Sequence, residues 1–235
     1  IREPSAANDG IAVLALDGTG QAVVTVRTLG LDASNDCLTV KYGSNGKTLW
    51  TRTYDGPGGG NDAAFAVAVD GAANVHLAGW SVGADGRWDY LTIKYDKDGR
   101  PLWVRRYDGP ARSNDGAFAL ALDGAGNVYV TGHSQGTDTS SDYATLKYSP
   151  AGKRLWTARY NGPANGYDGA AAVGIDRAAD RDAEGEEDAG DRGVDSGTEH
   201  RAPEHQPADD VALARRTGLE HPGRRRRGRQ RWARP

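Results

Sequence analysis

Residues 47–57 read KTLWTRTYDGP, and two near copies follow it, RPLWVRRYDGP at 100–110 and KRLWTARYNGP at 153–163. Successive copies begin 53 residues apart, without a gap. A period of this length is typical of a tandem array of supersecondary units. Three residues recur in every copy: a tryptophan (Trp50, Trp103, Trp156), a tyrosine (Tyr54, Tyr107, Tyr160) and a proline (Pro57, Pro110, Pro163).

The third unit, residues 115–167, shows what one repeat builds. Residues 116–123, GAFALALD, alternate large apolar residues with alanine, which favours a strand packed closely on one face. Two further strands are indicated at 127–132 and 142–149, which are rich in β-branched and aromatic residues. After a glycine turn, a fourth strand over 153–160 runs into a Gly-Pro pair that ends it. Four strands in about 50 residues, repeated, indicate the blade of a β-propeller.

The fold that we predict is therefore all-β: a partial β-propeller of tandem four-stranded blades with a 53-residue repeat, followed by a disordered C-terminal tail. Three blades cannot close a ring, because propellers close with about four to eight. The remaining blades of a parent propeller are therefore expected partners. The predicted segments are the end of a preceding blade (1–8), blade 1 (9–61), blade 2 (62–114), blade 3 (115–167), the first strand of a further blade (168–176) and the tail (177–235).

The repeat pattern stops within two residues of Asp176. Three interpretations of residues 177–235 are open. They are a disordered extension, an arm that binds nucleic acid through Arg224–Arg227, or a frameshifted copy of a fourth blade. The abrupt loss of register and the change from lysine to arginine favour the frameshift, and we expect no nucleic-acid partner. Because the chain contains no methionine, we expect it to be a fragment or a processed chain.

The recurring tryptophan and tyrosine have a structural explanation. They stand four residues apart on the outermost strand, so they lie on one face of the sheet, where blades diverge toward the rim. A residue that every copy needs usually serves the repeat itself. We therefore interpret both series as packing residues. The single cysteine, Cys37, stands where the other copies have Tyr90 and Tyr143, so it is expected in the core.

The string from Asp123 to Pro163, with its DGxGNVYVTG, DYxTxKY and LWxxRYxGP elements, resembles the bacterial β-propeller repeat known as the SBBP repeat. The resemblance covers residues 9–176. It implies a seven-bladed type of propeller in a large secreted or surface protein, an extracellular or cell-envelope location, and a binding or scaffold role without catalytic residues. The first copy departs from the pattern at Gln21, Val26 and Cys37.

The pieces GKTLW and GKRLW also resemble the repeat of quinoprotein dehydrogenases. That resemblance implies an enzyme domain with cofactor ligands in a central channel. The predicted inner strands are mostly Ala, Val and Leu, so we expect no cofactor and no enzyme activity. A propeller enzyme of this type stays an alternative to the binding module.

A ligand site on a repeat scaffold is expected where the copies differ. The loop between the second and third strands has constant length and variable content at 27–36, 80–89 and 133–142. In the middle copy it carries Trp80, Arg87 and Trp88, which suit stacking on a sugar ring or a peptide. Carbohydrate binding is thus a second alternative, and an unidentified protein or glycan is the expected ligand. The competing interpretation is that these side chains pack against neighbouring blades.

The remaining polar residues point to no metal or catalytic motif. His76 and His133 occupy different positions of their repeats and lack metal-ligand spacing. Asp62, Asp115 and Asp168 precede the first strand of their units, where a ring of carboxylates could bind a cation. We favour a role in capping turns through backbone N–H groups. The net charge of −3 implies no particular partner, and no membrane span is expected in this fragment.

Overall fold

The computed structural model describes residues 13–137 and 140–176 of the 235-residue chain. Within these ranges every regular element is a strand. The predicted segments 1–8 and 177–235 lie outside the described residues. The strands are β1 (Val13–Leu16), β2 (Ala22–Leu29), β3 (Asn35–Tyr42), β4 (Thr48–Tyr54), β5 (Asp62–Val69), β6 (Val75–Val82), β7 (Trp88–Tyr95), β8 (Pro101–Tyr107), β9 (Asp115–Leu122), β10 (Val128–Gln135), β11 (Ser141–Tyr148) and β12 (Arg154–Tyr160).

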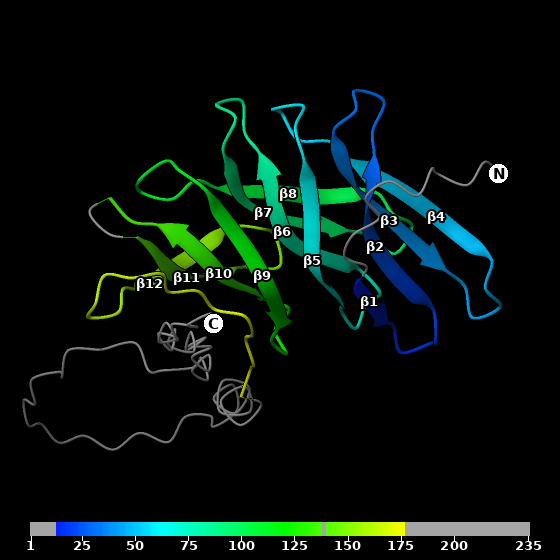
Figure 1. Ribbon diagram of the computed structural model, residues 1–235. Helices are drawn as coiled ribbons and strands as arrows, with labels where there is room; N and C mark the ends of the chain where they lie inside the picture. The colour runs from blue at the N-terminus through cyan, green and yellow to red at the C-terminus, as the bar shows by residue number, and fades with distance from the viewer. Residues whose placement is uncertain (1–12, 138–139, 177–235) are drawn as a thin grey trace, which may run out of the picture.

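The strands form three antiparallel sheets of four, which follow one another along the chain (Figure 1). Each sheet is a meander, with its strands hydrogen-bonded in sequence order. The first strand of each sheet packs on the sheet before it: β5 contacts β1, β2 and β3, and β9 contacts β5, β6 and β7. This face-to-face succession of meanders confirms the predicted all-β array of tandem blades, a partial propeller. We call the three sheets blades 1, 2 and 3.

The hydrophobic core lies between successive blades rather than within one sheet. One cluster joins blade 1 to blade 2 and contains Val23, Trp50, Leu77 and Ile93. A second cluster joins blade 2 to blade 3. Cys37 is 1% exposed in the first cluster, and burial raises the pKa of its thiol to about 11. Each blade therefore needs its neighbour to bury its apolar face, as expected of a repeat protein.

The glycine turns between the third and fourth strands reverse the chain, and those of blades 2 and 3 also leave room for a tryptophan. Gly46, Gly99 and Gly152 have φ between 76° and 78°, a region that favours glycine. At Gly99 space is also short, because a Cβ there would lie 2.7 Å from the Trp50 ring. The turn must therefore be glycine both to reverse the chain and to admit the tryptophan of the preceding blade.

A β-bulge interrupts the innermost strand of blades 2 and 3. The pairing of β5 with β6 skips Phe65, and that of β9 with β10 skips Phe118. Opposite the bulge, a side chain on Gly79 would overlap the carbonyl oxygen of Ala63. Blade 1 has Val26 at the position of Gly79, and the residues that would face it lie outside the described part of the chain. A bulge re-aims the extra side chain, and this places Phe65 and Phe118 in the site described below.

Residues 168–176, predicted as the first strand of a further blade, contribute no strand to a sheet. The backbone N–H groups of Asp168 and Ala170 donate to the carbonyls of Ser141 (2.6 Å) and Gly132 (3.2 Å), so the chain still runs against blade 3. A strand needs a ladder partner. By the repeat register that partner falls at 181–188, outside the described residues.

No helix in the described residues is long and apolar enough to cross a membrane.

Candidate functional site

The structure brings together the two tryptophans of the variable loop in blade 2. Trp80 lies in β6 and Trp88 begins β7, and the ladder pairs Trp80 with Tyr90 and Val82 with Trp88. The two indoles are thus diagonal neighbours on one face, and their centroids stack at 4.7 Å with an interplanar angle of 21°. Trp80 is buried at 8% exposure, whereas Trp88 is 39% exposed. The sequence does not distinguish the two residues, but only Trp88 has enough exposed surface to contact a ligand.

Arg87, the third predicted residue, is exposed, directly precedes Trp88 in the chain and is tied to the connection between blades 2 and 3. Its guanidinium donates to the carbonyl oxygen of Arg112. The backbone N–H of Trp88 donates to Oδ1 of Asn114 at 3.2 Å. Blade 1 repeats this second contact, where the N–H of Asn35 donates to Asn61 Oδ1 at 2.9 Å. The loop that carries Arg87 and Trp88 is therefore fixed at two points to the next blade.

The stacked pair continues into a longer series of rings that the sequence did not reveal. Trp80 packs against the bulged Phe65, with centroids 6.2 Å apart, and Phe65 meets Phe118 edge-on at 5.6 Å. Phe118 stacks on His133 at 5.2 Å, and His133 lies 5.7 Å from Tyr167. Both ends are open, since Tyr167 is 65% exposed. We call this series the aromatic row; its members are Trp88, Trp80, Phe65, Phe118, His133 and Tyr167.

The aromatic row is electrically neutral near pH 7. Its one titratable ring in that range is His133, whose pKa burial lowers below the ordinary value of 6.5. The row thus presents ring faces and edges, and Arg87 directly precedes Trp88, the residue at one end of the row. Such surfaces suit ligands with flat apolar faces and oxygen acceptors at their rims.

The recurring tryptophans and tyrosines lie outside the aromatic row. Trp50 and Trp103 are buried against the following blade, and Trp156 is half-buried with its ring 5.9 Å from that of Tyr129. Tyr54 packs on the first core cluster. Tyr107 and Tyr160 contact Tyr90 and Tyr143 of their own blades. The recurring prolines Pro57, Pro110 and Pro163 are exposed.

The pieces GKTLW and GKRLW lie at the hairpins that join the third strand of a blade to the fourth. Gly46 and Gly152 form the turns, and Leu49 and Leu155 on the strands that follow are exposed. In this chain the motif is thus accounted for by the geometry of a hairpin.

Each aspartate that precedes a first strand caps the Gly-Pro turn before it. Oδ2 of Asp62, Asp115 and Asp168 accepts the N–H of Gly56, Gly109 and Gly162 respectively, each at 2.6 Å. These short bonds hold the connection between blades, which fits the capping role.

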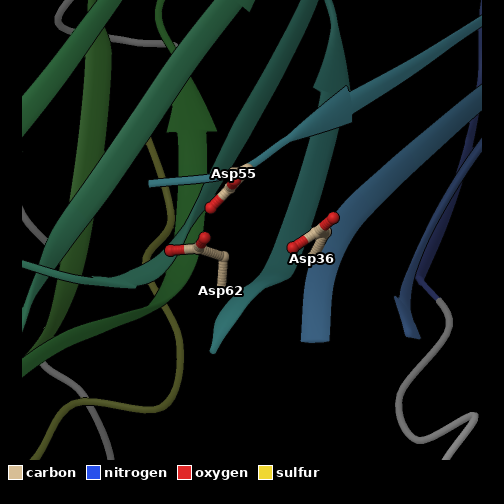
Figure 2. A group of neighbouring side chains, drawn as sticks. All are labelled: Asp36, Asp55 and Asp62. Carbon is tan, nitrogen blue, oxygen red and sulfur yellow. The ribbon is translucent and has the colours of Figure 1, made fainter. Parts of the chain in front are cut away.

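Two of these capping aspartates also face two carboxylates of the preceding blade. Asp62 lies with Asp36 and Asp55, and Asp115 lies with Asp89 and Asp108. Figure 2 shows the first group, with the Asp36 and Asp55 carboxylates turned toward that of Asp62.

Burial and mutual repulsion act on the first group. Burial, and then the charges of Asp55, Asp32 and Asp62, raise the pKa of Asp36. Burial likewise raises the pKa of Asp62, against the opposing effect of the hydrogen bond from the Gly56 amide.

A surface pocket of about 430 Å³ lies elsewhere, between blades 1 and 2. Its lining includes Trp50 and the buried ion pair of Lys41 with Asp17, whose Nζ and Oδ2 atoms are 3.3 Å apart. None of its lining residues belongs to the aromatic row, and the ion pair recurs in the other blades as part of the scaffold.

Comparisons with known proteins add little to this site. No protein-family model matches the sequence, and no curated protein does. Among solved structures, the chain is similar to a fucose lectin from Kordia zhangzhouensis in complex with methyl-fucoside, at 18% identity and a TM-score of 0.40. The match covers 64% of this chain and 99% of that one. At this identity and TM-score, the likeness carries no information about the ligand of this chain.

Proposed function

We propose that this chain is a non-catalytic binding module of a larger β-propeller and that it binds carbohydrate at the Trp88 end of the aromatic row. One observation carries the proposal: Trp88 stacks on the buried Trp80 yet stays 39% exposed, with the exposed Arg87 beside it. An indole held rigid from behind loses little conformational freedom when a ligand stacks on it.

The chemistry of a sugar ring fits this arrangement. One face of many pyranoses carries only C–H groups, which pack on a neutral aromatic face. The hydroxyl or carboxylate oxygens at the ring's edge can accept from Arg87, which has five N–H donors in a planar fork. Aromatic anchors and arginine are also the residues that most often dominate binding energy at interfaces.

The setting of the module is part of the same proposal. The resemblance of residues 9–176 to the SBBP repeat supports an origin in a secreted or surface-exposed bacterial protein, with an extracellular or envelope location. The described blades form an open series, and a closed propeller requires about four to eight blades. The remaining blades of the parent protein are thus the proposed structural partners.

The test is a glycan-array screen of the full chain, followed by calorimetric titration of the best ligands and by tryptophan fluorescence. We expect Trp88→Ala and Arg87→Ala each to weaken binding at least tenfold, about 1.4 kcal/mol. The matched control is Leu102→Ala, which trims another exposed side chain of blade 2, on β8. Binding that Trp88→Ala leaves unchanged, or a screen without any glycan ligand, would overturn the proposal.

A further inference from the structure

The carboxylates of Asp36, Asp55 and Asp62 converge at the junction of blades 1 and 2; we call these three residues the junction cluster. Asp36 lies in β3, Asp55 directly follows β4, and Asp62 begins β5. The chain therefore supplies two carboxylates from one blade and the third from the next. One oxygen from each residue lies within 4.8 Å of the other two (Figure 2).

One buried carboxylate oxygen of this cluster lacks a hydrogen bond. Asp62 is 0% exposed, and while its Oδ2 accepts from Gly56, its Oδ1 makes no hydrogen bond to any described residue. The neighbouring Val82 amide donates instead to the carbonyl of Asn61, at 3.3 Å. A buried carboxylate oxygen without a partner is costly, and a cation removes that cost.

The equivalent cluster of blades 2 and 3 meets the same need with protein groups. There Oδ1 of Asp115 accepts the N–H of Gln135 at 3.0 Å. Arg106 also pairs with Asp89, with its Nη2 and Nε atoms 2.6 and 3.1 Å from Oδ2. Blade 1 has Thr53 at the position of Arg106.

In blade 3 an arginine again pairs with an aspartate, and one of the three carboxylates is missing. Its Arg159 pairs with Asp142 at 2.9 Å, and Asn161 replaces the aspartate that corresponds to Asp55. Blade 1 is thus the copy that combines three carboxylates with no arginine at this position.

We propose that the junction cluster binds one calcium ion, which joins blade 1 to blade 2. The ligand set is all oxygen, which hard divalent cations prefer. Oxygens that coordinate one ion at 2.3–2.6 Å lie at most about 5 Å apart, so three carboxylates with oxygens within 4.8 Å of one another can share one ion. Calcium is preferred over magnesium because magnesium usually takes only one or two carboxylates and keeps several waters. The exposed Asp55 gives the ion and its water ligands access from solvent.

The experiment is calorimetric titration of calcium chloride into the full chain after treatment with a chelator, up to about 10 mM calcium, about tenfold above the dissociation constants of weak extracellular sites. We expect one site per chain, at least tenfold weaker binding of magnesium, and a rise in the thermal unfolding midpoint with calcium. Absence of calcium binding over this range, or equal affinity for magnesium, contradicts the proposal.

Two variants and one control locate the site. Asp55→Asn removes an exposed carboxylate that caps no turn, and we expect it to weaken calcium binding at least tenfold. Thr53→Arg installs the arginine of blade 2 beside Asp36, and we expect it to abolish binding while the apo protein keeps its circular-dichroism spectrum. The control Asp108→Asn changes the equivalent residue of the second cluster and leaves binding intact. Calcium binding that survives both variants, or that the control removes, would falsify the assignment.

Discussion

The indole Nε1 of Trp50 donates a 2.9 Å hydrogen bond to the backbone carbonyl of Lys97, in the outer hairpin of the next blade. Trp103 makes the same bond to Pro150 at 3.0 Å. Two residues further along the strand, Arg52 and Arg105 donate to glycine carbonyls of these hairpins. A tryptophan and an arginine thus clamp blade 1 to blade 2 and blade 2 to blade 3, which gives the recurring tryptophan its structural role.

Replacing Trp103 tests this clamp. Because its ring is 7% exposed and packs against Tyr148 of blade 3, we expect Trp103→Ala to lower the free energy of unfolding by about 3–5 kcal/mol. Trp103→Phe keeps much of the packing but loses the bond to Pro150, and should cost about 1–3 kcal/mol. Urea unfolding monitored by circular dichroism measures both values. Leu102→Ala is the control, since Leu102 is 53% exposed, and an equal loss there would contradict the clamp.

The strands, turns and recurring residues were predictable because their signals are local. Alternation, glycine at turns such as Gly46 and proline at strand ends are visible within a few residues. Because each signal recurs in several copies, an exception in one copy does not change the prediction. The repeat also predicted the packing of Cys37 in the core, since its equivalents are tyrosines of the same ladder position.

The two candidate sites were not predictable to the same degree. The junction cluster joins Asp36 and Asp55 to Asp62 across a blade boundary, and a repeat relates equivalent residues without saying which ones touch. The aromatic row depends on the bulges that re-aim Phe65 and Phe118, and no local pattern marks a bulge in an alternating strand. The stacking of Trp80 on Trp88 could have been found, since the hairpin register makes them diagonal neighbours.

A histidine-to-tyrosine exchange between blades gives a second prediction. His76 is fully buried, and its Nε2 lies 3.1 Å from Oδ2 of Asp70. Burial lowers the pKa of His76, so near pH 7 the neutral ring donates its Nε2–H to this carboxylate. In blade 3 the hydroxyl of Tyr129 donates to Asp123 at 3.2 Å instead.

We therefore expect His76→Phe to lose about 1–3 kcal/mol of stability, because the half-buried carboxylate of Asp70 loses a donor. His76→Tyr should stay within about 1 kcal/mol of wild type, because the hydroxyl restores the bond that blade 3 already uses. Thermal and urea unfolding of the two variants decide the matter. Equal losses in both would show that ring volume matters here and the bond does not.

Acid should unfold the scaffold through two aspartates. Hydrogen bonds from Thr19 and Gln21 and the proximity of Lys41 outweigh burial and lower the pKa of Asp17 to about 2. Burial by itself would raise the pKa of Asp70, but hydrogen bonds from Asn74 and His76 lower it to about 2. Each pKa lies below the ordinary value of 3.8, so the stability it brings is complete above about pH 4 and is lost as pH falls through 2.

For Asp70 this contribution is about 1–2 kcal/mol after allowance for solvent screening. Urea unfolding at a series of pH values between 5 and 2 should show the loss. The double variant Asp17→Asn with Asp70→Asn should be less stable at pH 5 and should show a flatter decline below pH 4. A decline as steep as that of wild type would assign acid unfolding to other groups.

Removing Arg106 from blade 2 tests the calcium proposal in the opposite direction, because it should create a second site. Arg106 pairs with Asp89 and also donates to the hydroxyl and carbonyl of Ser81, so Arg106→Thr leaves a half-buried carboxylate without these donors. We expect a loss of about 1–3 kcal/mol in the absence of divalent ions.

The variant copies blade 1, where Thr53 stands at this position, so Asp89, Asp108 and Asp115 should then gain weak calcium binding. Calorimetry should find a second site per chain in Arg106→Thr. This site should be the weaker one, because Oδ1 of Asp115 already accepts a hydrogen bond from Gln135, whereas Oδ1 of Asp62 has no such partner. Destabilisation without any added calcium binding would mean that the geometry of blade 1, and not the missing arginine, determines where the ion binds.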